Sequence, residues 1–215
     1  MLRALPLIVW VFFAAGPETV LAQSRIDVLV PTTLEAWKNK MFQGSTQYQP
    51  VLVQGMPAIK AVAQASASGL FREIKIDLTK TPFLNWRWRS KDSFRGNDER
   101  RKSGDDYVAR IYIVRSGGAL FWRTKALNYV WSSHQPVGAM WPSAYTSNAQ
   151  MIAVSSGPVR TGDWIMVKRN VRDDLRNAFG QEDIDTIDAV AIMTDADNTG
   201  QSVEAYYGEI YFSAQ

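Results

Sequence analysis

The sequence has no cysteine among its 215 residues and a single histidine, His134. Without cysteine, the chain can form no disulfide, no thiolate metal site and no lipid anchor on a cysteine. One imidazole cannot build a multi-histidine zinc centre either. The folded protein must therefore be stabilised by burial of a core, which a chain of this length permits.

The sequence also lacks a strong charge and a recognisable catalytic motif. The formal net charge is +3, far from the concentrated basic surface of a nucleic-acid-binding protein, so we expect no nucleic-acid partner. No P-loop, dinucleotide-binding glycine pattern or G-x-S-x-G elbow occurs. Ser132 and Ser133 adjoin His134, but adjacent residues rarely present a nucleophile and its base to each other. We predict no catalytic residue.

The first residues have the pattern of a secretory signal peptide. Arg3 precedes an apolar run over residues 4–15, and Val20 and Ala22 occupy the small-residue positions of a cleavage site. The run is shorter than the ~20 residues that span a bilayer. We therefore expect cleavage after Ala22, with residues 23–215 forming one soluble domain in the periplasm or outside the cell.

Short segments of alternating apolar and polar residues predict strands along most of the chain. Ile74 and Ile76 alternate with Lys75, which is typical of a half-buried strand. In the next predicted strand, over residues 84–89, Trp86 and Trp88 share one face and are expected in the core. The other predicted strands cover residues 26–30, 59–64, 107–114, 119–122, 126–131, 151–154, 164–169, 189–194 and 203–212.

One helix is predicted with clear end signals. It covers residues 171–179, with Asn170 as its N-cap and Gly180 at its exit, and a weaker helix is expected over residues 34–40. Many short strands without alternating helices predict an all-β fold. We expect an antiparallel two-sheet β-sandwich, a jelly roll, with one or two short helices.

Two charged segments carry predictions of their own. Residues 87–102 hold seven basic and three acidic side chains around an expected loop over residues 90–104. We interpret this as a solvated loop, with an anion-facing loop as the alternative. Asp106 precedes Arg110 by four residues, a spacing that puts both on one face of a strand. We predict that Asp106 is structural, either paired with Arg110 or capping the loop after Gly104.

The strongest candidate binding site is the hairpin loop after residue 194. Asp195, Asp197 and Asn198 could contact sugar hydroxyls, and Asp195 and Asp197 could hold calcium, although the same residues also suit a turn that needs no ligand. Tyr206 or Tyr207 could add a stacking face on the next strand. These neighbours point to opposite faces, so only one can face a ligand at the loop.

Three phrases of the sequence together resemble a known family. They are Leu-Asn-Trp-Arg-Trp-Arg over residues 84–89, Gly-Asp-Asp-Tyr-Val-Ala-Arg-Ile-Tyr over 104–112, and Thr-Asp-Ala-Asp-Asn-Thr-Gly over 194–200 with the strand that follows. This order is similar to domain-of-unknown-function family 3047, a bacterial family of exported proteins, over roughly residues 26–212. The resemblance implies a jelly roll similar to galactose-binding-like domains and carbohydrate-binding modules. It implies no activity and no catalytic residues.

These observations favour an exported β-sandwich that binds a ligand without catalysing a reaction. The expected ligand is a glycan or another component of the cell envelope. One alternative is a hydrolase or lyase that acts on envelope polysaccharide through a pair of carboxylates, which would have to face each other across a cleft. A structural or protein-interaction domain of the cell envelope is the other. No cofactor is expected beyond the candidate calcium ion.

Overall fold

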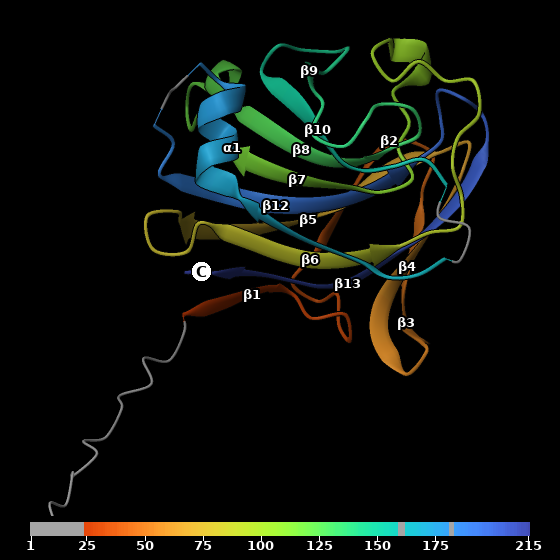
Figure 1. Cartoon of the computed structure of the whole chain (residues 1–215), viewed down its shortest axis with the longest axis horizontal. Helices are drawn as coiled ribbons and strands as arrows, with labels where there is room; N and C mark the ends of the chain where they lie inside the picture. Colours follow the sequence, from red (N-terminus) through yellow and green to blue (C-terminus); the bar gives the residue numbers. More distant parts are fainter. Residues whose placement is uncertain (1–23, 159–161, 181–182) are drawn as a thin grey trace, which may run out of the picture.

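A computed structural model of the chain describes residues 24–158, 162–180 and 183–215. The signal peptide predicted over residues 1–22 lies outside these ranges. Figure 1 shows two layers of strands with one helix at an end of the layers, which confirms the predicted all-β sandwich. In the part of the chain that the structure describes, no helix has both the length and the apolar character needed to cross a membrane.

The first layer is a six-stranded sheet. Its strands follow the order β11-β6-β13-β4-β3, and β1 pairs with β13 beside this path. All of its pairs are antiparallel. The strands are β1 (Arg25–Leu29), β3 (Gln47–Val53), β4 (Met56–Gln64), β6 (Phe83–Arg89), β11 (Ile165–Asn170) and β13 (Ser202–Ser213).

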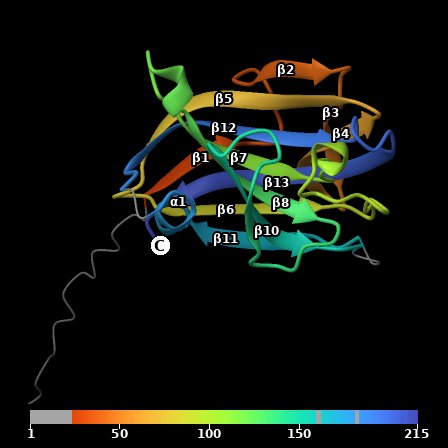
Figure 2. The same ribbon diagram turned by 90° about the horizontal axis from the view of Figure 1, so that it is seen from above.

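The second layer is a seven-stranded sheet with the order β2-β5-β12-β7-β8-β10-β9, and Figure 2 shows its strands from β2 to β10 side by side. The pair β8–β10 is parallel, so the predicted antiparallel sandwich has one parallel pair. The chain returns through β9, which pairs antiparallel with the outer edge of β10 and so leaves β10 parallel to β8. The strands are β2 (Lys38–Gln43), β5 (Ala67–Asp77), β7 (Arg110–Arg115), β8 (Lys125–Ser132), β9 (Met140–Pro142), β10 (Ala149–Ser156) and β12 (Thr186–Asp195).

Aromatic side chains join the two sheets in the core. Trp86 and Trp88 of β6 are 3% and 0% exposed and point into the interior. Trp86 lies 5.2 Å from Tyr129, and Trp88 lies 5.9 Å from Trp131, measured between ring centroids. Tyr129 and Trp131 belong to β8 of the other sheet. Because both strands have period two, their inward residues meet while their other residues face outward.

The helix α1 (Val171–Ala178) closes one end of the sandwich, as predicted to within one residue. The side chain of Asn170 accepts a hydrogen bond from the backbone nitrogen of Asp173 at 3.3 Å, so the predicted N-cap forms. Val171 and Leu175 are fully buried beneath the helix. Asp174 accepts a hydrogen bond from Tyr129 Oη at 2.7 Å, which ties the helix to β8.

Two predicted elements are wrong. Residues 119–122 form no strand but lead into a 3₁₀ turn, η2 (Phe121–Arg123), because the chain folds back closely on Gly117. A Cβ atom at Gly117 would lie 2.1 Å from the carbonyl oxygen of Leu120. Residues 34–40 form a turn and the start of β2 instead of a helix, since pairing with β5 outweighs the weak helical pattern.

The loop over residues 90–104, with the 3₁₀ turn η1 (Lys102–Gly104), is more than a solvated connection. Phe94 and Glu99 are each 1% exposed. Glu99 accepts hydrogen bonds from Ser132 Oγ and the backbone nitrogen of Ser133, at the end of β8. The loop therefore packs against the sandwich, and the interpretation of a purely solvated loop is wrong for these residues.

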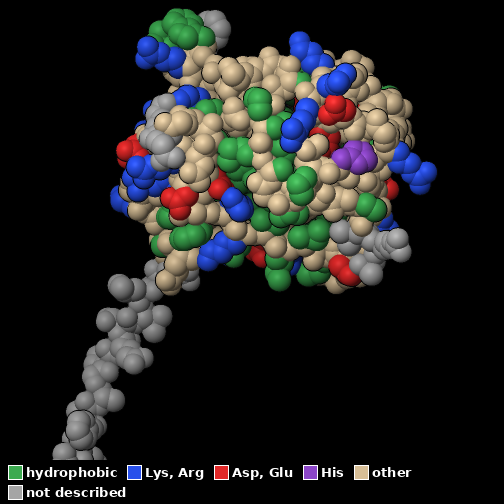
Figure 3. Space-filling view, turned by 45° about the horizontal axis from the view of Figure 1, so that its top comes forward, with side chains coloured by type: hydrophobic (Ala, Val, Ile, Leu, Met, Phe, Trp, Pro, Cys, Tyr) green, Lys and Arg blue, Asp and Glu red, His purple; other side chains and the backbone are tan. Residues whose placement is uncertain are grey.

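Exposed hydrophobic side chains are scattered on the surface turned to the viewer in Figure 3. They form small groups between polar areas, while lysine and arginine side chains lie mostly toward the edge. Single exposed apolar side chains are normal for a folded protein and indicate no site by themselves. Cavities and unpartnered polar atoms are therefore better guides to function here.

The aromatic core gives a direct test of stability. Trp88→Ala is expected to lower the free energy of unfolding by ~3–5 kcal/mol, because it removes a fully buried ring that contacts both sheets. Trp122→Ala is the matched control, since the Trp122 side chain is 57% exposed, and its effect should stay below about 1 kcal/mol. Urea melts of both variants measure the difference, and equal losses would contradict the core assignment.

A candidate ligand-binding groove beside the acidic hairpin loop

The hairpin loop between β12 and β13 is held in place by Asp106. The carboxylate of Asp106 accepts hydrogen bonds from the backbone nitrogen and Nδ2 of Asn198 at 3.2 and 3.1 Å. It also accepts one from the backbone nitrogen of Thr199 at 2.6 Å. The Asp106 side chain is 0% exposed, so these donors replace the water that it loses. Asp106 therefore caps this hairpin loop and has a structural role.

The predicted ion pair between Asp106 and Arg110 is wrong, because Arg110 pairs with Asp195. Arg110 Nε donates to Asp195 Oδ1 at 3.0 Å, and Arg110 Nη2 donates to Asp195 Oδ2. Arg110 Nη1 also lies 3.7 Å from Asp105 Oδ2. Strands β7 and β12 are neighbours with Arg110 opposite Met193, so Asp195 follows two residues along on the same face. Strand β7 begins only at Arg110, and the spacing argument therefore fails for Asp106.

Burial and neighbouring charges shift the pKa values of Asp105, Arg110 and Asp197. Burial raises the pKa of Asp105, although the nearby Arg110 opposes the shift. Burial also raises the pKa of Asp197, and the like charge of Asp106 adds to the effect. For Arg110, burial alone would lower the pKa, yet the surrounding tyrosines and aspartates raise it above its ordinary value. The Arg110 guanidinium thus pairs with two carboxylates, those of Asp195 and Asp105. The ionised forms of Asp105 and Asp197 have too few hydrogen-bond donors around them to offset burial, which is why their pKa values rise.

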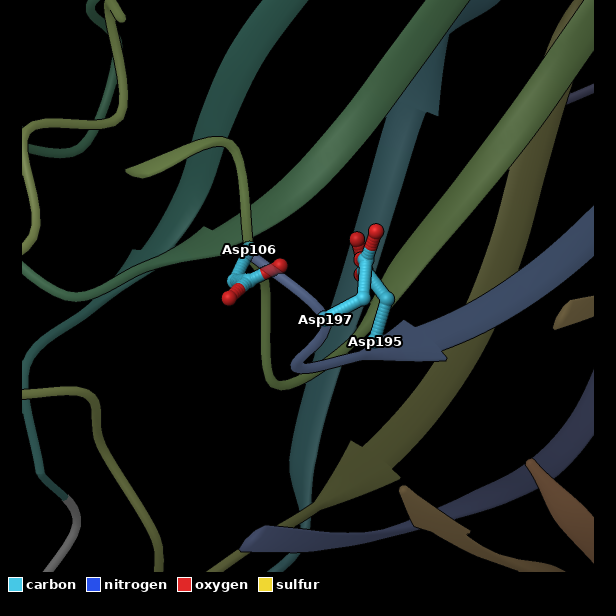
Figure 4. Close-up of side chains that lie close together, drawn as sticks. All are labelled: Asp106, Asp195 and Asp197. Atoms are coloured by element: carbon cyan, nitrogen blue, oxygen red, sulfur yellow. The ribbon is translucent and has the colours of Figure 1, made fainter. Parts of the chain in front are cut away.

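The carboxylates of Asp106, Asp195 and Asp197 lie close enough to be considered as metal ligands. One oxygen of each lies within 4.8 Å of the others, and Figure 4 shows Asp195 and Asp197 pointing the same way. Backbone amides already bind Asp106, and Arg110 binds both oxygens of Asp195. Asp197 accepts one hydrogen bond, from Asn198 Nδ2 at 3.2 Å. Calcium binding by Asp195 and Asp197 stays a prediction, with Arg110 in competition.

A groove runs from this cluster over the outer face of the seven-stranded sheet. One hollow of about 460 Å³ reaches Asp105, Arg110, Asp195, Asp197 and Asn198. A second hollow of about 270 Å³ continues over β5 and β12. The two share part of their lining, which is Phe42, Tyr112 and Met193. The predicted loop residues Asp195, Asp197 and Asn198 therefore lie together at one end of a larger groove.

The base of the groove is formed by small residues that lie between aromatic ones. Phe71, Ala191, Tyr112 and Asn128 lie opposite one another on β5, β12, β7 and β8. They form one row across the sheet, because directly opposed residues in an antiparallel pair point to the same face. Gly69 lies on the next row, where it adds no side chain. Aromatic rings thus flank a shallow floor.

Two oxygen atoms beside this groove are buried without a hydrogen-bond donor. They are Asp105 Oδ1 and Asn128 Oδ1, and no donor among the described residues reaches them. Asn128 uses its Nδ2 to donate to the carbonyl oxygen of Gln150 at 3.3 Å, which fixes the orientation of its amide. A buried acceptor without a partner costs about 1–3 kcal/mol. Both residues line the 460 Å³ hollow with other atoms, while these two oxygens themselves are shielded from its contents.

The structure does not bring the two predicted tyrosines to the loop. Tyr207 is 0% exposed, and its hydroxyl donates to the carbonyl oxygen of Met193 at 2.6 Å within the core. Tyr206 faces outward on the other sheet, where its hydroxyl donates to Glu204. Tyr207 therefore offers no surface to a ligand, and Tyr206 lies on the wrong layer. The aromatic residue at the loop is Tyr145, whose hydroxyl donates to Asn198 Oδ1 at 3.1 Å.

Most residues of the groove were not predicted from the sequence. Phe71 and Tyr112 stand at outward positions of strands, where alternation usually places a polar residue, and this is the signal that could have found them. Asn128 has the opposite signal, a polar residue within the apolar run over residues 126–131. Neither signal identifies neighbours across the sheet, because that requires the strand order.

This fold is a two-sheet β-sandwich with a ligand-sized groove on one outer face. The chain belongs to the family described as Protein of unknown function (DUF3047), whose model matches residues 35–211. The family predicted from the sequence phrases is thereby confirmed. Among curated proteins, no sequence matches this chain.

Solved structures with similar folds are distant from this chain. A family 11 carbohydrate-binding module from Clostridium thermocellum, in complex with a β-1,3-1,4-mixed-linked tetrasaccharide, is 12% identical with a TM-score of 0.48, covering 87% of this chain and 94% of that chain. A family 11 module of a cellulosomal cellulase from the same organism is 11% identical with a TM-score of 0.48, covering 90% and 95%. The family 11 xylanase from Neocallimastix patriciarum is 10% identical with a TM-score of 0.37, covering 91% and 94%. Likeness at this level carries no argument about the ligand.

The capping role of Asp106 can be tested by a substitution that keeps its shape. Asp106→Asn should lower the free energy of unfolding by about 1.5–3 kcal/mol, because a charged acceptor of three donors becomes a neutral amide. Asp98→Asn is the control, since Asp98 is exposed and pairs with Arg101 on the surface. Thermal melts give the stability, and ligand binding should fall only with the folded fraction. A fully folded Asp106→Asn protein that loses binding would show a direct role in the site.

Proposed function

We propose that this protein is an exported glycan-binding module without catalytic activity, and that its ligand is a neutral sugar chain in the groove of the seven-stranded sheet. The observation that carries the proposal is the groove itself, where the aromatic side chains of Phe42 and Tyr112 adjoin an end lined by the acceptors of Asp105, Asp197 and Asn198. Sugar hydroxyls are donors, and they match acceptors of this kind.

The aromatic half of the groove supports the same ligand class. A sugar ring has an apolar face of C–H groups, and flat side chains such as those of Phe42, Phe71 and Tyr112 can pack against it. The small floor at Gly69 and Ala191 leaves room for the ring between them. Ligand sites commonly combine an apolar lining with a few polar groups that set orientation.

The charge of the polar half favours a neutral ligand over an acidic one. Asp105, Asp195 and Asp197 line this end together with one basic residue, Arg110. Arg110 is already committed to Asp195. A sugar carboxylate or phosphate would meet unbalanced negative charge, while hydroxyl groups would supply the missing donors.

The binding test compares variants on the two outer faces. Phe42→Ala and Tyr112→Ala should each weaken binding to the neutral glycan found by an array screen by about tenfold, which corresponds to ~1.4 kcal/mol. Phe42 is 63% exposed, so its variant keeps the fold intact. Tyr206→Ala on the other sheet is the matched control and should bind as the wild type does.

The same screen separates the remaining alternatives. Running it with and without calcium tests the predicted ion at Asp195 and Asp197, because a required ion makes binding and melting temperature depend on calcium. Binding only to acidic glycans, or unchanged binding by Phe42→Ala and Tyr112→Ala, would contradict the proposed groove. An array without any bound glycan would leave a structural or protein-interaction role in the envelope as the better account.

A carboxylate-dependent hydrolase or lyase is the second candidate, because two carboxyl groups with raised pKa values, those of Asp105 and Asp197, line one hollow. A glycosidase needs such a pair at about 5–10 Å across the scissile bond. An assay for new reducing ends on the bound glycan decides between the two functions. Release by the wild type that Asp105→Asn abolishes would identify the enzyme.

Export is the remaining part of the proposal, and it depends on the N-terminal sequence pattern alone. Cleavage after Ala22 predicts a mature chain that begins at Gln23. Mass spectrometry of the protein purified from a bacterial periplasm or culture medium measures this terminus. An uncleaved chain that remains in the cytoplasm would contradict it.

A further inference from the structure

The outer face of the six-stranded sheet carries basic side chains that the proposed function does not use. Strand β6 points Trp86 and Trp88 inward, so Arg87 and Arg89 point outward on the alternate positions. Arg89 lies opposite Tyr206 of β13, and Arg87 lies opposite Met166 of β11. The groove lies on the other sheet, and Figure 1 shows the two sheets as separate layers.

The basic side chains on this face lack acidic partners. Among the residues described, no ion pair involves any of the following four: Arg87, Arg89, Lys91 and Lys168. The nearby acids are already engaged, since Glu204 pairs with Lys60 at 2.6 Å and Glu209 pairs with Arg25 at 2.8 Å. Asp92 accepts a hydrogen bond from the backbone nitrogen of Glu204 at 2.6 Å. That hydrogen bond leaves the charge of Asp92 in place, so the four basic side chains give this face a smaller excess of positive charge than their number alone.

Three nitrogen donors on this face are also shielded from water without an acceptor. They are Arg87 Nε, Arg89 Nη1 and Trp164 Nε1. The Arg87 guanidinium lies 5.4 Å from the Trp164 ring centroid, and the Arg87 side chain lies against Gly208, where a Cβ atom would approach it to 2.4 Å. The Arg87 side chain is thus packed against the protein and partly desolvated, and its Nη1 lies 3.2 Å from Met56 Sδ. A cation in that state gains more from an arriving anion than a fully hydrated one does.

Two hollows give such an anion access to the two arginines. One of about 360 Å³ is lined by Arg89, Lys91, Asp92, Glu204 and Tyr206. The other, of about 210 Å³, is lined in part by Arg87, Lys168 and Glu209. Residues two apart on a strand are separated by about 7 Å, so the two arginines offer two binding points in a row. Guanidinium groups bind the planar edge of an oxyanion through paired hydrogen bonds.

We propose that this face binds an acidic polysaccharide through its phosphate or sulfate groups, with Arg87 and Arg89 as the principal contacts and Lys91 and Lys168 as supporting charges. A polymer with charges on successive units occupies both hollows at once, which gives it an advantage over a free anion that fills one. The site is independent of the groove, so one molecule could hold a neutral chain on one layer and an acidic chain on the other.

The experiment is isothermal titration calorimetry of the mature chain with dextran sulfate, with uncharged dextran and inorganic phosphate as separate probes. The double variant Arg87→Gln/Arg89→Gln should bind dextran sulfate at least about tenfold more weakly. Lys75→Gln/Arg123→Gln removes the same charge from exposed positions elsewhere and should bind as the wild type does. Wild-type binding should weaken as salt rises, because the contact is electrostatic.

A second variant guards against a loss of folding, since Arg87 packs against Trp164. Lys91→Gln/Lys168→Gln changes two exposed side chains and should weaken binding by about two- to fivefold with an unchanged melting temperature. Equal weakening in the Lys75→Gln/Arg123→Gln control would overturn the site. Binding to uncharged dextran would also overturn the site. The same holds for binding to inorganic phosphate or to phosphatidylglycerol vesicles if dextran sulfate does not bind.

Discussion

The buried ion pair between Arg110 and Asp195 is the interaction on which the candidate site depends. Both side chains are almost fully shielded from water, at 5% and 1% exposure. A buried charge without a partner is strongly unfavourable, so each residue requires the other to be in place. The pair joins the start of β7 to the end of β12, and it thereby fixes where the hairpin loop begins. Asp106 then holds the far side of the same loop.

The aromatic core explains why both outer faces are available for binding. Trp86, Trp88, Tyr129 and Trp131 pack between the layers, and the alternate positions of their strands point outward. The alternate residues are then free to carry other chemistry. On β7 and β5 they are Tyr112 and Phe71, which line the groove. On β6 they are Arg87 and Arg89, so one strand supplies core on one side and charge on the other.

The two faces differ in what they lack. The groove has carboxylate and amide oxygens without donors, whereas the opposite face has guanidinium and indole nitrogens without acceptors. Native structures leave few buried polar atoms unpaired, so a group of them on one face is informative. Hydroxyl-rich and oxyanion-rich ligands are the complementary partners. The two proposed roles therefore differ because one face has acceptors without donors and the other has donors without acceptors.

How much could be predicted from the sequence follows from the range of each interaction. The alternation around Trp86 and Trp88, the cap at Asn170 and the turn residues at 195–200 act over a few positions, so the class of fold, one helix and the loop were predictable. The partner of Arg110 was not, because strand order places Asp195 beside it from 85 residues away. The same order decided that Tyr207 is buried, that Tyr206 faces the other side, and that Phe71, Tyr112 and Asn128 form one row. Side-chain direction along a strand is a local property with period two, whereas the neighbour across the sheet is set by tertiary pairing alone.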